Sequence, residues 1–395
     1  MQGFDMNILL IDTGSYTLAD LMAKLGEMGH KCRTLPYSYN REDWELKYHN
    51  DEFEGKLSNE LVSKPDAVMT TNFYPLIARV CHEKDVRYIS WSYDSPMNLP
   101  LIEEMDHPTN FVFLFDKKDV QKYRDLGLEH FYHLPLAVNC DRLDRIATEE
   151  RFVTDVSFVG QLYNSTLPML RSIMAPDHRE LVDKIVQTQL RIYGNWFVSD
   201  MLTDGIIDAM NTHFRSLGPG AIQITKDQLA YSIAQQITYM ERLSLLKLLS
   251  ISGICTDLYS NPLNDEEKAL LDKVNIHGRV SYDKEMPALF RSSRINLNPT
   301  LKIIQSGIPL RALDIMGCGG FLLTNFQPEI DEYFENGLEV VMYKSIEEAA
   351  DKAKYYLTHE EERSKIARRG YEKVRRDFRY EDRILEMFRI AGLQN

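Results

Sequence analysis

The chain has 395 residues, enough for two ordinary domains, because a single hydrophobic core stops growing at about 250 to 300 residues. Its hydrophobic content of 44% and charged content of 27% are ordinary for a soluble globular protein. The formal net charge of −13 argues against a nucleic-acid partner, because phosphate contacts need clustered lysine and arginine.

Neither a membrane span nor a secretion signal is expected. No apolar run approaches the ~20 residues of a spanning helix, and the first one, residues 8–11, follows no basic segment. The five cysteines show no Cys-x-x-Cys spacing, which predicts reduced thiols and no zinc site. We therefore expect a cytoplasmic protein.

The first 150 residues alternate between short apolar runs and helical patterns. Residues 6–12 form such a run, followed by a turn and by a helix from Leu18 with apolar side chains at helical spacing. Further runs lie at residues 67–69, 88–91 and 111–115. This alternation predicts a parallel sheet in an α/β domain.

A charged stretch at residues 141–151 separates this region from a second one. A new strand–helix pattern opens at residues 156–160, and the chain then reads as helical over about 167–249. The remaining predicted elements are strands at 253–259, 274–277, 295–298 and 321–324, and helices at 345–357, 359–374 and 380–390. We predict domains over 1–150 and 151–378, with a helical elaboration at about 167–249 and a C-terminal helix over 379–395 that crosses back to the first domain.

Residues 306–323 read as a helix that holds a nucleotide diphosphate. Gly307 and Pro309 mark its start, and its first amides can bind pyrophosphate. Arg311 can reinforce this site, and Asp314, roughly 7 Å along the axis from Pro309, can accept hydrogen bonds from a ribose. An ordinary helix N-terminus with an Arg311–Asp314 ion pair is the alternative.

Several motifs resemble the CgeB-like (spore-maturation type) branch of GT-B glycosyltransferases, with a group 1 glycosyltransferase-like C-terminal domain. In order along the chain they are residues 155–160, 277–281, 286–290, 295–298 and 306–325. Residues 64–68, 88–96 and 134–137 are similar to the N-terminal domain often paired with that branch. The resemblance implies two Rossmann-like domains whose parallel sheets face a central cleft.

The resemblance also implies a donor site in the second domain. Related enzymes carry two acidic residues with seven residues between them, of which the second contacts the ribose; Asp314 stands at the second place and Ser306 at the first. They also place an arginine on the phosphates soon after a glycine like Gly160, whereas Gln161 follows here. The predicted donor-binding residues are Gly160, His277, Arg279, Asn298, Lys302, Ser306, Gly307, Ile308, Pro309, Arg311 and Asp314.

Some of these residues have alternative interpretations. Lys302 and Arg311 are the expected replacements for the missing phosphate charge, but Lys302 could equally be a solvated surface lysine. The side chain of His277 could be a satisfied strand-end histidine, which we favour, with the base contacted by backbone groups of its loop. Asn298 could cap a turn instead of facing the phosphates.

The acceptor side is expected in the first domain. Thr13 and Gly14 form its first strand-to-helix turn, which lacks a Gly-x-Gly-x-x-Gly motif and so argues against a dehydrogenase. Asp94 is the candidate base, because a carboxylate near aromatic rings can have a raised pKa; an Asx-turn or helix cap before Pro96 is the alternative. The other predicted residues on this side are Asn72, Tyr74 and Tyr93, although Tyr74 could simply be a packed aromatic.

The resemblance and the motifs together predict a metal-independent glycosyltransferase of the hexosyltransferase type. It would move a sugar from a nucleoside diphosphate sugar, with a UDP-sugar favoured, to a hydroxyl of a protein or glycan acceptor, and would need no other cofactor. Resemblance suggests flagellin or the spore surface as the acceptor. A nucleotide-sugar epimerase of the same fold and a non-catalytic sugar-nucleotide-binding subunit remain the alternatives.

Overall fold

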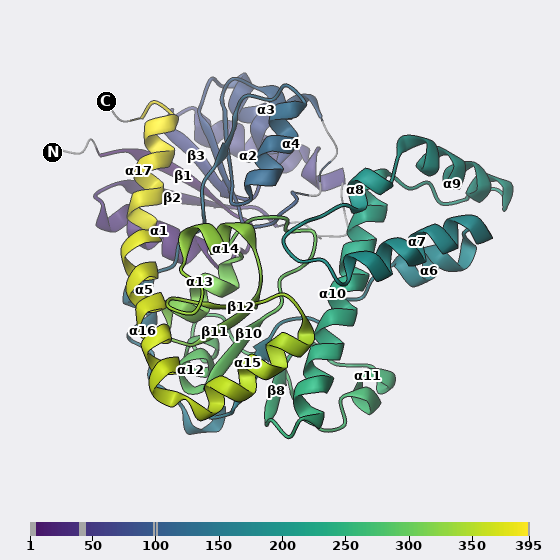
Figure 1. Ribbon diagram of the computed structural model, residues 1–395. Helices are drawn as coiled ribbons and strands as arrows, with labels where there is room; N and C mark the ends of the chain where they lie inside the picture. The colour runs from purple at the N-terminus through teal and green to yellow at the C-terminus, as the bar shows by residue number, and fades with distance from the viewer. Residues whose placement is uncertain (1–4, 39–44, 98, 100–101, 394–395) are drawn as a thin grey trace. The chain divides into compact units, whose positions relative to one another are not determined.

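The structure is a computed structural model that describes residues 5–38, 45–97, 99 and 102–393. The chain divides into two compact units, residues 1–139 with 375–395 and residues 140–374. None of the described helices combines the length and the apolar composition needed to cross a bilayer. Figure 1 shows the elements of both units.

The first unit is built on a six-stranded parallel sheet in the order β2-β1-β3-β4-β5-β6. Its strands are β1 (Asn7–Asp12), β2 (Lys31–Pro36), β3 (Ala67–Thr71), β4 (Tyr88–Ser92), β5 (Asn110–Leu114) and β6 (Phe131–His133). The predicted apolar runs correspond to β1, β3, β4 and β5. Sequence analysis missed β2, an edge strand whose residues are largely exposed, and β6, which has only three residues.

Helices surround this sheet, and the last helix of the chain is one of them. They are α1 (Leu18–Glu27), α2 (Asp51–Leu61), α3 (Pro75–Glu83), α4 (Lys117–Asp125) and α17 (Tyr380–Ile390), with 3-10 turns at Glu45–Lys47 and Glu103–Asp106. α17 packs against α1 and β5. The Nε of Arg87 donates to the carbonyl of Ala391 at 2.8 Å, which anchors the end of α17 to the start of β4.

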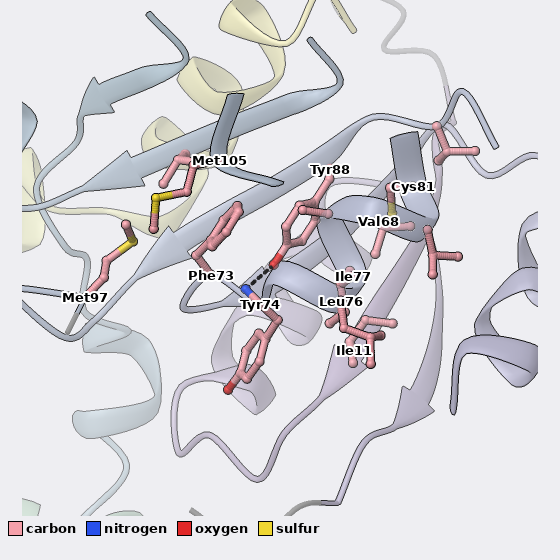
Figure 2. Close-up of a cluster of buried hydrophobic side chains, with 14 of the residues drawn as sticks. Ile11, Val68, Phe73, Tyr74, Leu76, Ile77, Cys81, Tyr88, Met97 and Met105 are labelled. Atoms are coloured by element: carbon pink, nitrogen blue, oxygen red, sulfur yellow. Dashed lines mark hydrogen bonds between the residues drawn. The ribbon is translucent and has the colours of Figure 1, made fainter. Parts of the chain in front are cut away.

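The core of the first unit contains buried polar contacts at the hydroxyl of Tyr88 (Figure 2). The hydroxyl of Tyr88 lies 2.8 Å from the Oγ1 of Thr70 and accepts a hydrogen bond from the amide of Tyr74 at 3.0 Å. Burial raises the pKa of Tyr88. Because a buried hydroxyl needs partners, these contacts fix the turn between β3 and α3, where the predicted site residues Asn72 and Tyr74 lie.

The second unit is built on another six-stranded parallel sheet, in the order β12-β11-β10-β7-β8-β9. Its strands are β7 (Val156–Val159), β8 (Thr256–Tyr259), β9 (Asn275–His277), β10 (Ile295–Asn298), β11 (Leu322–Asn325) and β12 (Val341–Tyr343). Sequence analysis predicted the first five. It missed β12, which is buried but three residues long.

The helices of this unit cover its sheet and extend beyond it. They are α5 (Cys140–Leu143), α11 (Asp265–Leu270), α12 (Glu285–Ser292), α13 (Leu310–Gly317), α14 (Pro328–Tyr333), α15 (Ile346–Thr358) and α16 (Glu360–Asp377), with a 3-10 turn at Glu150–Phe152. α10 (Lys226–Ile251) packs against α15 and β8, and α13 packs against α12, β10 and β11.

The predicted helical elaboration is confirmed. It consists of α6 (Leu167–Ile173), α7 (Pro176–Gln189), α8 (Val198–Met201), α9 (Asp204–Ser216) and α10. These helices share a core of their own that includes Val182, Met210, Phe214 and Ile233, each at most 1% exposed. Figure 1 shows α6 to α9 beside the first half of α10. The second half of α10 packs against the sheet.

Each sheet has one point at which successive strands are added on opposite sides. This switch point lies between β1 and β3 in the first unit and between β7 and β10 in the second. In open parallel sheets, ligands bind at the carboxyl ends of the strands beside such a point. The two switch points are therefore where functional side chains are expected.

Candidate functional site

Arg242 of α10 braces the switch point of the second unit. Its Nε donates to the carbonyl of Pro299 at 3.0 Å, and its Nη1 donates to the carbonyl of Gln161. These carbonyls follow the ends of β10 and β7, so one guanidinium joins both strands. The guanidinium also lies 5.0 Å from the ring centre of Phe158 and 4.9 Å from that of Tyr163.

Sequence analysis missed Arg242. Related enzymes place an arginine soon after such a glycine, where this chain has Gln161; the structure instead brings an arginine near Gly160 from α10, with its Nη1 3.8 Å from where a side chain on Gly160 would begin. The available signal was the pair Glu241–Arg242, two adjacent charged residues among the apolar residues of the second half of α10. Burial lowers the pKa of Arg242.

Beside Arg242, Glu241 forms a buried ion pair with Lys302. The Nζ of Lys302 lies 2.8 Å from the Oε2 of Glu241, and the two side chains are 7% and 0% exposed. At this distance the attraction between the opposite charges holds the pair. The ammonium also lies 3.8 Å from the ring centre of Tyr193. Burial and the charge of Glu241 raise the pKa of Tyr193.

This pairing bears on the predicted role of Lys302. The interpretation as a solvated surface lysine is wrong, because the side chain is buried. Its charge is compensated by Glu241, which favours a structural role. Contact with donor phosphates stays a prediction for Lys302.

The loop before α13 places a buried carboxylate beside Ser306. The Oγ of Ser306 donates to the Oε1 of Glu329 at 2.7 Å, and the amide of Glu329 donates to the carbonyl of Ser306 at 3.0 Å. Glu329 is 1% exposed. Ser306 holds the place where related enzymes carry an acidic residue, and sequence analysis did not anticipate that α14 would supply one next to it.

α13 begins within one residue of the predicted start. Pro309 is its N-cap residue with φ −67°, and the helix runs from Leu310. Gly307 and Ile308, which precede Pro309, are buried. The first amides of this helix lie beyond the carboxyl ends of β10 and β11, against which it packs.

Arg311 has no carboxylate partner among the described residues. Its Nη1 lies 2.8 Å from the Sδ of Met286, and its guanidinium lies 5.6 Å from the ring centre of Phe290. The ion pair with Asp314 that the alternative interpretation required is not formed. A half-buried cation at a helix N-terminus suits an anionic ligand.

Asp314 lies on the buried side of α13. It is 4% exposed, and its Oδ1 accepts a hydrogen bond from the hydroxyl of Tyr282 at 3.2 Å. Burial and the charge of Asp314 raise the pKa of Cys318. Contact between Asp314 and a ribose stays a prediction.

The remaining predicted donor residues already have partners. The Nε2 of His277 lies 2.6 Å from the Oδ1 of Asp257, and its ring stacks on Tyr259 at 4.5 Å. This is the satisfied strand-end histidine that sequence analysis favoured. Arg279 donates to the Oδ1 of Asn261. Asn298 is 5% exposed, and its Nδ2 donates to the Oγ1 of Thr324 at 3.2 Å and to that of Thr300 at 3.3 Å.

In the first unit, two turns with positive φ shape the switch point. Gly14 has φ +75°, and its amide donates to the Oδ1 of Asp12 at 2.9 Å. Thr13 lies between them. Asn72, after β3, has φ +71°, a conformation that asparagine tolerates better than most residues.

Asn72 holds Asp94 in place. Its Nδ2 donates to the Oδ2 of Asp94 at 2.8 Å, and its Oδ1 accepts from the amides of Tyr93 at 2.8 Å and Asp94 at 3.2 Å. Asp94 itself is exposed. Sequence analysis named all three residues but not their contact, which joins the ends of β3 and β4.

The two predicted tyrosines differ in placement. Tyr74 is 5% exposed and packs in the core (Figure 2), so the packed-aromatic interpretation is correct and Tyr74 leaves the acceptor-side set. Tyr93 is half-buried, and its ring lies 5.2 Å from that of Trp91. Among the described residues, no group of three His, Cys, Asp or Glu side chains is placed to hold a metal ion.

Comparison with known proteins identifies the architecture. Residues 244–389 match the family described as glycosyl transferase-like, and no curated protein sequence matches the chain. Anabaena HepE in complex with UDP-glucose is similar in structure, with a TM-score of 0.55 and 9% identity over 98% of this chain and 100% of that one. The chain has the GT-B glycosyltransferase fold.

Two further GT-B structures give the same result. Sucrose-phosphate synthase from Thermosynechococcus elongatus has a TM-score of 0.58 and 10% identity, with 98% of each chain covered. A UDP-forming α,α-trehalose-phosphate synthase from Burkholderia xenovorans has a TM-score of 0.56 and 11% identity over 98% of this chain and 100% of that one. At such identities the likeness establishes the GT-B fold alone, as sequence analysis predicted.

Proposed function

We propose that this GT-B protein transfers a sugar from a nucleoside diphosphate sugar to a hydroxyl of a protein or glycan acceptor. One observation carries the proposal: the glycosyl transferase-like match over residues 244–389 contains every predicted donor residue except Gly160. Arg311 adds support, because its charge is not neutralised by a carboxylate of the described chain.

A UDP-sugar is the proposed donor, and a hexose the proposed sugar. The support is that HepE, of the same fold, was solved with UDP-glucose, and that the Burkholderia xenovorans synthase is described as UDP-forming. The ordered motifs quoted above support the CgeB-like branch within this fold. By the same resemblance, flagellin or a spore-surface glycan is the proposed acceptor.

The donor half of the reaction needs stabilisation of the departing diphosphate. In this proposal the amides at the start of α13 and the guanidinium of Arg311 supply it, since fixed dipoles and cations stabilise charge that develops as the glycosidic bond breaks. No metal ion has a role in the proposed step. Arg242 acts on this site indirectly, by holding the ends of β7 and β10 in register.

The acceptor half needs removal of a proton. The acceptor hydroxyl oxygen would attack the anomeric carbon, the bond from that carbon to the diphosphate oxygen would break, and the proton would pass to the carboxylate of Asp94. Asn72 would orient that carboxylate through its 2.8 Å hydrogen bond. General bases of this kind contribute about 10²–10⁴-fold to rate.

Incubation with a panel of UDP-, GDP-, TDP- and ADP-sugars tests the proposal, with released nucleoside diphosphate as the measurement. Release of UDP, equal with magnesium and with EDTA, is the expected result. A new sugar epimer without release would instead indicate the epimerase, and binding without turnover the non-catalytic subunit. Failure to bind any of these nucleotides would contradict all three.

A further inference from the structure

We propose that a groove at the amino ends of β10 and β11 in the second unit binds a phosphate-bearing small molecule. The groove has a volume of about 420 Å³ and is lined by Arg291, Arg294, Arg363 and Arg368, together with Ser293 and Ser364. The inference does not rest on the proposed function.

The groove is separate from the candidate donor site. Arg294 directly precedes β10, and Phe321, which also lines the groove, directly precedes β11. The predicted donor residues between Asn298 and Asp314 lie at or after the opposite, carboxyl end of β10. A four-residue strand at ~3.3 Å per residue places the two ends about 13 Å apart, so one phosphate group cannot occupy both.

Positive charge gathers in this groove although the chain as a whole carries −13. Among the residues that the structure describes, no aspartate or glutamate lines it. Arg294 is paired with Asp155 at 3.0 Å. The carboxylates nearest to the other three arginines are farther away and do not line the groove: Asp144 is 3.6 Å from Arg291, Glu360 is 4.0 Å from Arg363, and Glu372 is 3.9 Å from Arg368. Contacts of 3.6 to 4.0 Å are too long for hydrogen bonds. One N–H of Arg291 donates to the carbonyl of Leu143 and one N–H of Arg363 to that of Tyr356, and the other N–H groups of these arginines can bind an anion.

Two features of the arginines are unfavourable until an anion binds. The Nε of Arg291 is buried and has no hydrogen-bond acceptor among the described residues, and a buried donor without an acceptor is costly. Burial lowers the pKa of Arg363, and the like charge of Arg294 lowers it further, against the opposing charges of Glu360 and Asp155. A bound anion would relieve both conditions.

The chemistry of the lining indicates phosphate. Guanidinium groups match the oxygens of a phosphate through paired N–H donors, and serine hydroxyls add single hydrogen bonds. A volume of about 420 Å³ falls in the range of small-molecule sites. We therefore infer a phosphorylated metabolite rather than a single bound ion.

Isothermal titration with ribose 5-phosphate, at constant ionic strength and with ribose as the unphosphorylated control, tests the site. Arg294→Gln with Arg368→Gln removes two groove charges from side chains that are 53% and 68% exposed, so folding should be retained. Arg215→Gln with Arg389→Gln removes the same charge from exposed positions elsewhere.

Ribose 5-phosphate should bind the wild type and the Arg215/Arg389 control with equal affinity. It should bind the Arg294/Arg368 groove variant at least tenfold more weakly. Ribose should not bind to any of the three proteins. Absence of ribose 5-phosphate binding, or equal binding by the groove variant, would overturn the inference. UDP binding should be the same in the groove variant and the wild type. The ribose 5-phosphate titration contains no nucleotide. It therefore decides the groove proposal even if the protein does not bind UDP and the proposed function fails.

Discussion

The two switch points are held in different ways. In the second unit, buried charges from α10 and from the loop after β10 fix the strand ends. In the first unit, two turns with positive φ and local hydrogen bonds fix them. Arg242 and the Glu241–Lys302 pair are almost completely buried. Asp94, by contrast, is exposed and held by Asn72. The difference indicates that removal of these buried charges should cost stability in the second unit, whereas removal of the exposed charge of Asp94 should cost chemistry in the first.

The largest effect is expected from Asp94→Asn in the first unit. The variant loses the proposed base, so the rate of sugar transfer should fall by about 10²–10⁴-fold. Stability and UDP affinity should stay as in the wild type, because the side chain is exposed. Steady-state release of UDP in the presence of acceptor is the measurement. Asp125→Asn, also an exposed carboxylate of this unit, is the matched control, and equal rates for both variants would remove Asp94 from the mechanism.

Glu241→Gln should have the next largest effect, on stability. It leaves the buried ammonium of Lys302 without a counter-charge, which costs about 3–5 kcal/mol, measured as the free energy of unfolding in denaturant. Removal of both charges in Glu241→Gln with Lys302→Met should recover much of this loss.

An exposed lysine–glutamate pair provides the control for this experiment. Glu180 and Lys184 are 2.6 Å apart with side chains 67% and 70% exposed, and Glu180→Gln should cost under about 1 kcal/mol. If Glu241→Gln is as mild as Glu180→Gln, the switch point of the second unit is not fixed by buried charge.

Arg311→Ala should weaken UDP binding by about 10- to 100-fold, since hydrogen bonds to charged groups contribute about 1.5–3 kcal/mol. Isothermal titration with UDP measures the change. Arg215→Ala, an exposed arginine of α9, should bind UDP as the wild type does. An Arg311→Ala variant with unchanged affinity would show that another group neutralises the diphosphate.

The smallest effect concerns pH and the first unit. Burial lowers the pKa of His107, and the stacked ring of His82, 4.1 Å away, lowers it further. The folded state thus favours neutral His107, so its contribution to stability is complete above pH 6.5, the ordinary pKa, and is lost as the pH falls below it. His107→Phe keeps a stacked ring and should make the thermal midpoint less sensitive to pH between 7 and 5. An unchanged pH profile would assign acid sensitivity to other groups.

Sequence could predict those features that depend on local pattern. The apolar runs of β1, β3 and β4 and the helix start at Gly307–Pro309 are visible in a few residues. β2 and β12 were missed because one is an exposed edge strand and the other has three residues. In both cases the local apolar pattern is too weak or too short.

Contacts between distant residues could not be predicted in this way. Arg242 reaches the loop after β7 only because α10 packs across the sheet, and Glu329 reaches Ser306 only because α14 follows the neighbouring strand. The contact between Asn72 and Asp94 likewise depends on the pairing of β3 with β4. The types of residue were visible, but their partners depended on the fold.

Hydrogen–deuterium exchange with and without UDP tests the donor site most directly. Bound UDP should slow amide exchange after β7, at residues 160–163, and from the end of β10 to the start of α13, at residues 299–312, with no protection at residues 319–321 beside the arginine groove. Absence of protection at 299–312, or protection confined to the first unit, would contradict the assignment of the donor site to the second unit.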